Sequence, residues 1–216
     1  MIFVNFKIYP STFSHQAVNL VKIIKEVSVE SSVKIIPIVS SLDAVEATSQ
    51  LPEVFIQHID EYLEGPFTGR ISSLHAASLG LSGALINHSE YRQKPGTIKK
   101  IIKSLPKNFQ SIVCLQTINQ AITWGKFIKP SFIAYEPTAL IGSKTESVAT
   151  KHSDAIKKFV NFYPNIPIIV GAGIHSVEDV KISLSSGAKG ILVASDIITS
   201  SDPKKELLDL ALAFRK

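Results

Sequence analysis

Three polar residues stand where short apolar runs end, and their side chains could move protons on a small anionic substrate: Lys7, His88 and Glu136. An ammonium group buried at Lys7 would need an anionic ligand or a carboxylate partner, because burying an unpaired charge is costly. A neutral His88 ring could donate a hydrogen bond to a carbonyl oxygen and exchange protons with it. Pro137 disfavours helical geometry at Glu136, which makes this carboxylate a candidate general base at a strand end. Taken singly, a solvated lysine and a structural histidine remain open alternatives.

The neighbours of these residues predict how they are held. Strand periodicity places Asn5 and Lys7 on one face, which would point into the mouth of a barrel. Ser89 and Glu90 can begin a helical turn, whose amides would disfavour an imidazolium and keep His88 neutral.

Two turns of glycine and small residues predict a phosphate site, namely Val170-Gly171-Ala172-Gly173-Ile174 and Val193-Ala194-Ser195-Asp196. Such turns let backbone N–H groups approach an anion closely, and each leads into a predicted helix start where amide donors are unpaired. A tight turn without a ligand stays open as the alternative, because a single Gly-x-Gly is a weak signal.

Eight short apolar runs alternate with helical stretches, and each run is typical of a buried parallel strand. This order predicts an α/β fold with a single (β/α)8 barrel, with trimmed loops because the chain is near the lower size limit of about 200 residues. An open sheet of fewer strands remains the alternative for the weakest stretches, 40–51 and 118–127. The eight predicted strands are Ile2 to Lys7, Val33 to Val39, Val54 to His58, Gly83 to Asn87, Ser111 to Leu115, Phe132 to Glu136, Ile166 to Val170 and Gly190 to Ala194.

Some helices have start signals of their own. Ser14 is a possible cap of the first helix, and Ser176 to Asp179 form a variant capping box. Asp202 precedes a proline at the first position of a closing helix, which we expect over Lys204 to Phe214.

Composition narrows the class of protein. With 216 residues, 45% hydrophobic and 19% charged, the chain can bury a full core as one domain, 1–216, unlike a disordered or fibrous protein. The formal charge is +5, but the basic residues are scattered along the chain and form no long run. We therefore expect small phosphorylated partners and no nucleic acid. No signal peptide or apolar run of about 18 residues occurs, so we expect no membrane attachment. The single cysteine, Cys114, favours a reducing compartment and a cytoplasmic protein.

These residues resemble the triosephosphate isomerase family from Ile2 to about Leu212. The motifs occur in the family's order, and the short length and the small-residue turns are similar to its compact, archaeal-type branch. The resemblance implies a single TIM barrel with shortened loops. The matching motifs are Asn5-Phe6-Lys7, Phe67-Thr68-Gly69, Asn87-His88-Ser89-Glu90, Tyr135-Glu136-Pro137 and Leu140-Ile141-Gly142.

The resemblance implies an intramolecular aldose–ketose isomerase of glycolysis and gluconeogenesis. It would interconvert dihydroxyacetone phosphate and D-glyceraldehyde 3-phosphate through an enediolate, without metal or organic cofactor. By the same resemblance, Glu136 is the base, His88 the neutral electrophile and Lys7 the group that stabilises enediolate and phosphate charge, roles inherited from the family. The remaining implied site residues are Asn5 in the pocket, Glu90 as the partner of Lys7, and Gly142, Gly173, Ala194 and Ser195 as phosphate-binding amides.

Assembly is implied in the same way. Phe67-Thr68-Gly69 resembles the loop that relatives insert into a neighbour's active site, where the threonine braces the catalytic lysine and histidine. We therefore expect a homodimer or a homotetramer, with Thr68 as a supporting residue.

Three positions depart from the family's pattern. The lid, about Pro137 to Thr145, has Lys144 at its second hinge, which would be strained at positive φ. Asp196 stands where the compact branch tends to have glycine, so its carboxylate must point away from the phosphate or weaken its binding. The segment after Cys114 lacks an acid that many relatives carry there.

Two rival functions stay open. One is a phosphate-binding scaffold that has lost turnover, supported only by Lys144 and Asp196. The other is a different phosphosugar isomerase or epimerase, which would need acid–base residues other than His88 and Glu136. The other histidines, His175 among them, are expected to be surface or cap residues, and His58 is less certain because it also ends a strand.

Overall fold

The computed structural model describes residues 1–125, 127–137 and 148–214. Its eight strands are all parallel and pair in sequence order, and β1 closes the barrel by pairing with β8. The strands are β1 (Ile2–Asn5), β2 (Ile35–Val39), β3 (Phe55–Ile56), β4 (Gly83–Ile86), β5 (Gln110–Leu115), β6 (Phe132–Tyr135), β7 (Ile168–Val170) and β8 (Gly190–Val193). The predicted (β/α)8 barrel is confirmed.

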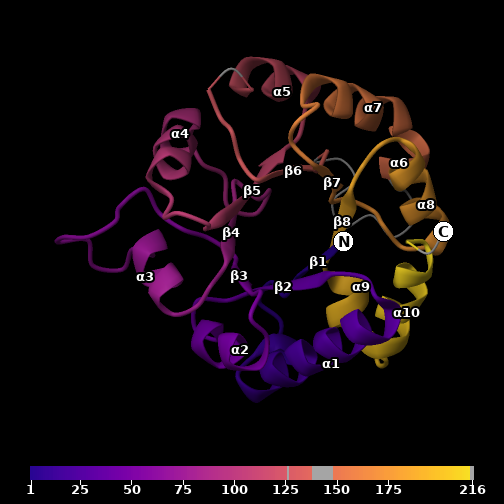
Figure 1. Ribbon diagram of the computed structural model, residues 1–216, viewed down its shortest axis with the longest axis horizontal. Helices are drawn as coiled ribbons and strands as arrows, with labels where there is room; N and C mark the ends of the chain where they lie inside the picture. The colour runs from indigo at the N-terminus through magenta and orange to yellow at the C-terminus, as the bar shows by residue number, and fades with distance from the viewer. Residues whose placement is uncertain (126, 138–147, 215–216) are drawn as a thin grey trace.

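Helices form a ring around the strands (Figure 1). In chain order they are η1 (Pro10–Thr12), α1 (His15–Ser31), α2 (Ala44–Gln50), α3 (Ser73–Ser78), α4 (Pro95–Ser104), α5 (Ile118–Trp124), α6 (Val148–Lys151), α7 (Ser153–Phe162), α8 (Val177–Ser185), α9 (Ser195–Ile198) and α10 (Pro203–Leu212). None of these described helices is both long and apolar enough to span a bilayer.

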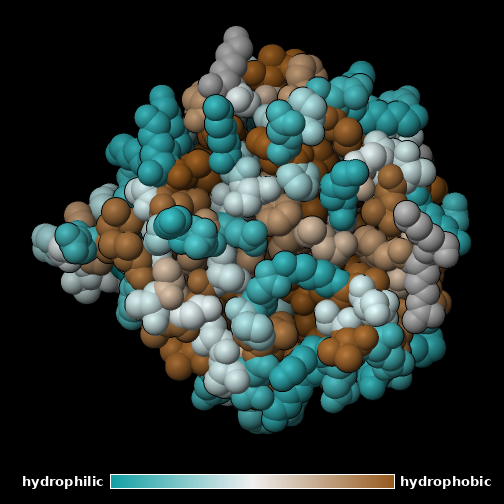
Figure 2. Space-filling model, viewed as in Figure 1, coloured by the Kyte–Doolittle hydropathy of each residue, from teal (hydrophilic) through white to brown (hydrophobic). Residues whose placement is uncertain are grey.

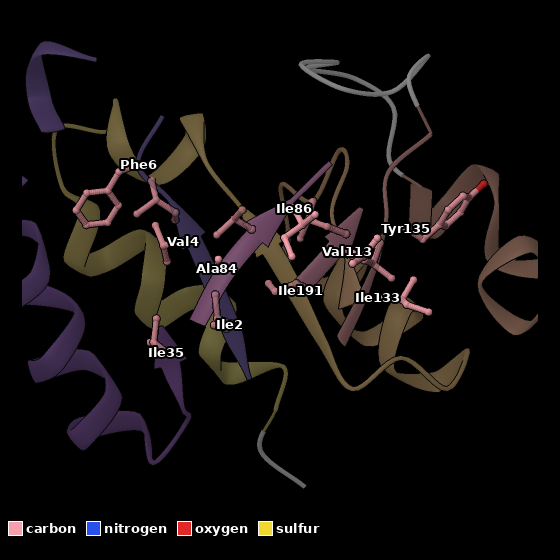
Figure 3. Close-up of a cluster of buried hydrophobic side chains, with 14 of the residues drawn as sticks. Ile2, Val4, Phe6, Ile35, Ala84, Ile86, Val113, Ile133, Tyr135 and Ile191 are labelled. Atoms are coloured by element: carbon pink, nitrogen blue, oxygen red, sulfur yellow. The ribbon is translucent and has the colours of Figure 1, made fainter. Parts of the chain in front are cut away.

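Strand alternation divides the core into two layers. In β1, Phe3 belongs to the cluster inside the barrel, whereas Ile2 and Val4 belong to the larger cluster between strands and helices. Figure 3 shows part of this outer layer, where Phe6 continues the same face. The layers leave only the strand ends free for polar side chains, as parallel strands buried on both faces require.

Several predicted boundaries are wrong by a few residues. The first strand ends at Asn5 instead of Lys7, because Lys7 has a left-handed φ of 50° that turns the chain out of the sheet. The fourth strand ends before Asn87, which has a φ of 62°. The closing helix covers Pro203–Leu212, so it begins one residue earlier and ends two residues earlier than expected.

Two of the three expected helix caps form a side-chain hydrogen bond. The Ser176 box forms, with its hydroxyl accepting from the Asp179 amide, and Asp202 accepts from the Lys205 amide. Ser14 does stand at the N-cap position of α1, but its side chain makes no cap bond and its φ is 50°. Its amide instead donates to the Asp43 carboxylate, 2.9 Å away, so this start is fixed from a neighbouring loop.

Candidate active site

One cavity of about 250 Å³ lies at the carboxyl ends of the strands and gathers the predicted chemistry. Lys7 enters it after β1, His88 after β4 and Glu136 after β6. Its other side is formed by the segments that follow β7 and β8, 171–175 and 192–196. Residues far apart in the sequence therefore share one site, at the end of the barrel where this fold places its chemistry.

Lys7 reaches the cavity by a different route from the one expected. Strand periodicity does not apply to it, because it lies beyond β1 in left-handed conformation. Its amide donates to Asn5 Oδ1 at 3.1 Å, and its carbonyl accepts from the Gln57 side chain at 3.0 Å. Its Nζ lies 2.7 Å from Glu90 Oε1, so this carboxylate partly neutralises the ammonium at the cavity wall. The implied pairing of Glu90 with Lys7 is confirmed.

Glu136 is the most deeply buried ionisable group of the cavity, with 1% of its surface exposed. Burial raises the pKa of its carboxyl, and the nearby His88 and a hydrogen bond from the Cys114 thiol oppose that rise. Burial also raises the pKa of Cys114 well above its usual value, which keeps the thiol protonated as a donor. Among the described residues, Glu136 Oε2 has no hydrogen-bond partner. One carboxylate oxygen is thus available to accept a proton.

Gly171 makes room for this carboxylate. A Cβ at this position would lie 2.6 Å from Glu136 Cγ and 2.7 Å from its Oε1. Any side chain at position 171 would therefore displace the carboxylate, so glycine is required here by close approach and not by backbone conformation.

The His88 ring is oriented by its own loop. The amide of Glu90 points to its Nδ1 at 3.3 Å, which makes Nδ1 an acceptor and assigns the proton to Nε2. Nε2 lies 3.7 Å from Glu136 Oε1. The expected helical turn is a single turn closed by Tyr91 N–H to His88 C=O at 2.9 Å, and the next helix begins only at Pro95. The ring is therefore oriented by one amide and not by the end of a helix.

The two small-residue turns line the opposite end of the cavity. Gly173, with a φ of 59°, Ala194 and Ser195 all contribute to its wall. The Asp196 carboxylate next to them pairs with the Nδ1 atom of His175, and both residues line the cavity. His175 is exposed and precedes the Ser176 cap, as expected of a surface or cap residue, and in addition it lines the cavity. Gly142, Lys144 and the lid after Pro137 lie outside the described residues.

The sequence comparisons agree with this geometry. The sequence model of the family described as "Triosephosphate isomerase" matches residues 1–211. The chain belongs to the triosephosphate isomerase family. Among curated proteins named triosephosphate isomerase, that of Methanothermus fervidus is 36% identical, covering 97% of this chain and 96% of its own. The Thermoplasma volcanium protein is 36% identical, and the match covers 89% of this chain and 91% of that protein. The Saccharolobus solfataricus protein is also 36% identical, and the match covers 97% of this chain and 93% of that protein.

One residue implied by the family does not reach the cavity of its own chain. Thr68 is exposed on the segment between β3 and α3, which projects beyond the ring of helices at the left of Figure 1. Thr68 is not among the residues that line the cavity. A role at an active site would therefore have to be played in another copy of the chain.

Two residues that hold this site in place were not predicted from the sequence. Asn87, 2% exposed, donates to the Cys114 carbonyl at 2.8 Å and accepts from the Gln93 amide at 2.9 Å, which fixes the chain just before His88. Gln57 binds Asn5 Oδ1 and the Lys7 carbonyl. Both could have been found from their position, because each is an amide side chain that directly follows a strand. Asparagine tolerates the left-handed region, and an amide can both donate to and accept from backbone groups.

Proposed function

We propose that this chain interconverts dihydroxyacetone phosphate and D-glyceraldehyde 3-phosphate by proton transfer through an enediolate. The observation that carries the proposal is the shared cavity of Lys7, His88 and Glu136 at the carboxyl ends of the strands. An isomerase activity is what the family and the names of the relatives support. The roles below rest on the family's known chemistry and on the contacts of these side chains.

Glu136 is the proposed base, which takes the pro-R proton from C1 and returns it at C2. Its raised pKa makes it a stronger base than an ordinary carboxylate, and its unpartnered Oε2 leaves it room to act. Its partners, His88 and the Cys114 thiol, keep the ionised form accessible. A buried carboxylate that is neither fully solvated nor fully paired is suited to proton abstraction.

His88 is the proposed electrophile. With Nδ1 accepting from the Glu90 amide, Nε2–H can donate to the substrate carbonyl oxygen, where negative charge develops in the enediolate. Lys7 would stabilise the same charge and the phosphate, with Asn5 beside it in the pocket wall. The backbone amides of Gly173, Ala194 and Ser195, together with that of Gly142, would hold the phosphate.

The enzyme is tested by a coupled assay of glyceraldehyde 3-phosphate isomerisation on the wild type, Glu136→Asp and a control, His15→Ala, whose exposed ring lies outside the cavity. We expect turnover in the wild type and the control, and a loss of about a hundredfold in Glu136→Asp, which withdraws the base by about 1 Å. No wild-type turnover with retained 2-phosphoglycolate binding would favour the scaffold. Turnover unchanged in Glu136→Asp would favour an isomerase with another base.

We also propose that the active unit is a homodimer or a dimer of dimers in the cytoplasm, the reducing compartment that a single cysteine favours. The projecting segment supports assembly, because it carries both hydrophobic and hydrophilic surface at the left of Figure 2. Its Phe67 is 40% exposed and stacks on Tyr62 at 4.2 Å between ring centroids. A second cavity of about 460 Å³ beside Lys7 and His88 could receive Thr68 of another copy.

Assembly is tested by sedimentation equilibrium of the wild type and Phe67→Asp. We expect a dimer or tetramer for the wild type, and dissociation with a fall in kcat for the variant, because a charge would replace the apolar ring in the interface. A wild-type monomer with full activity would refute the proposed assembly.

A further inference from the structure

The side chains of His175 and Asp196 form a hydrogen-bonded pair that has no part in the catalytic roles proposed above. The imidazole Nδ1 meets the carboxylate Oδ2, and the two residues come from different turns, His175 after β7 and Asp196 at the second position of α9. Because β7 and β8 are neighbouring strands, the pair bridges the two turns proposed to hold the phosphate. His175 follows Gly173 by two residues, and Asp196 follows Ser195 directly.

The backbone beneath His175 is fixed independently of this pair. The Asp179 carboxylate, in a residue only 7% exposed, accepts from the amides of His175 at 3.2 Å and Ser176 at 3.0 Å, and from the Ser176 hydroxyl at 2.7 Å. The position of the turn therefore does not depend on the imidazole. What the imidazole does control is the carboxylate that it holds.

Asp196 presents an electrostatic problem at this place. A carboxylate next to amides that bind a phosphate would repel the ligand, because like charges at this range oppose each other even in partly solvated surroundings. Both partners line the cavity, with side chains 29% and 43% exposed for His175 and Asp196. They also line a shallower outer cavity, into which Glu206 of α10 adds another carboxylate. A half-exposed pair contributes little to stability, so orientation is its more telling effect.

We propose that His175 and Asp196 form a clamp across the phosphate end of the cavity, in which the imidazole holds the carboxylate and screens its charge from the substrate phosphate. Both act as positioning residues and neither touches the reacting carbons. The clamp rests on the proposed function, since it assumes a phosphate at Gly173, Ala194 and Ser195. It accounts for an acid at a position where the resemblance led us to expect glycine, because the partner that compensates the acid lies on the facing turn.

The clamp is tested by steady-state kinetics of His175→Ala, Asp196→Asn and the double variant, with inorganic phosphate as a competitive inhibitor and His15→Ala as the control. For His175→Ala we expect KM and the Ki of phosphate to rise roughly three- to tenfold, with kcat within about a factor of two, because the freed carboxylate opposes the phosphate in ground and transition states alike. In the Asp196→Asn background, the same His175→Ala change should raise neither constant, because the charge is gone.

The outcomes separate the clamp from simple packing and from the isomerase itself. A penalty of His175→Ala that persists in the double variant would overturn the clamp, since loosened packing does not depend on the Asp196 charge. A wild type that isomerises while His175→Ala keeps wild-type KM and Ki would also overturn it and leave the enzyme proposal intact. If the wild type does not turn over, the proposed function fails. The clamp is then decided by the Kd of 2-phosphoglycolate, measured by calorimetry on the wild type, the two single variants and the double variant. A Kd raised by His175→Ala alone but not in the Asp196→Asn background supports the clamp, and any other pattern overturns it.

Discussion

The inside of the barrel and its mouth are built on the same strands, yet their side chains meet opposite demands. Inside, Phe3 packs against Phe55 and Phe132 with ring centroids 5.5 and 5.3 Å apart. At the mouth, Glu136 is as buried as those rings but keeps one oxygen without a described partner, and Lys7 adopts a left-handed backbone. Burial stabilises the first region and costs free energy in the second, as expected where reactivity is placed on a rigid frame.

Removing the charge at the mouth should have the largest effect on activity. Replacing Lys7 by methionine keeps most of the stem but removes the ammonium that would stabilise the enediolate and phosphate. We expect a loss of about 10²–10³ in kcat/KM, the size found when one preorganised donor is removed. Steady-state kinetics measures this loss, with Lys34→Met as the control. Lys34 pairs with Glu53 and lines neither of the two cavities to which His88 contributes. Equal losses in the two variants would refute a specific role for Lys7.

Asn87 tests how the end of a barrel strand holds a residue of the mouth, because it lies between β4 and His88. Asn87→Ala loses two hydrogen bonds and places an alanine at a φ of 62°, so we expect about 2–3 kcal/mol less stability and roughly tenfold lower kcat. Asn87→Gly loses the same bonds without the backbone strain and should recover part of the stability but not the activity. Denaturant unfolding together with kinetics separates the two contributions. Recovery of full activity by glycine would show that the side chain does not position His88.

Glu136 offers a test of the cost of burial. Its pKa is raised in the folded state, so between the unfolded and folded pKa values the folded chain binds more protons, and its contribution to stability falls as the pH rises through that interval. Glu136→Gln cannot ionise, so its melting temperature should gain on the wild type as the pH is raised from about 4 to 8. Calorimetry at a series of pH values measures the difference. A difference in melting temperature that stays constant with pH would contradict the proposal that burying the ionised Glu136 carboxylate lowers the stability of the fold.

The smallest effect is expected inside the barrel. Ile112 is fully buried in the inner cluster, and Ile112→Val should cost about 1 kcal/mol of unfolding free energy with kcat within a factor of two. Denaturant unfolding and the isomerase assay on the same preparation check this. A large fall in kcat at unchanged stability would mean that the two regions are not separable.

The strands of the barrel could be predicted from the sequence more completely than the geometry of the active site. Apolar runs bounded by polar turns predicted all eight strands, and the residues at their ends predicted which side chains share the cavity. Backbone direction beyond the strand ends could not be predicted, because Lys7 turns into the left-handed region where strand periodicity no longer holds. The His175–Asp196 pair was also missed, since it depends on two loops that meet only after neighbouring strands pair.

The same limit explains the Ser14 cap. A serine before a helical run is a local signal, but here the amide is bound by Asp43, a residue from another loop. Local patterns therefore served well for elements with their own capping residues, such as the helix after Ser176. They failed where a distant side chain supplied the hydrogen bond.

The central claim is that Glu136 moves the substrate proton, and solvent exchange tests it most directly. Dihydroxyacetone phosphate is incubated in deuterated water with the wild type or Glu136→Gln, and deuterium at C1 is followed by NMR. The wild type should introduce solvent deuterium at C1, and the variant should do so at least a hundredfold more slowly. Exchange at the wild-type rate in Glu136→Gln would contradict the account.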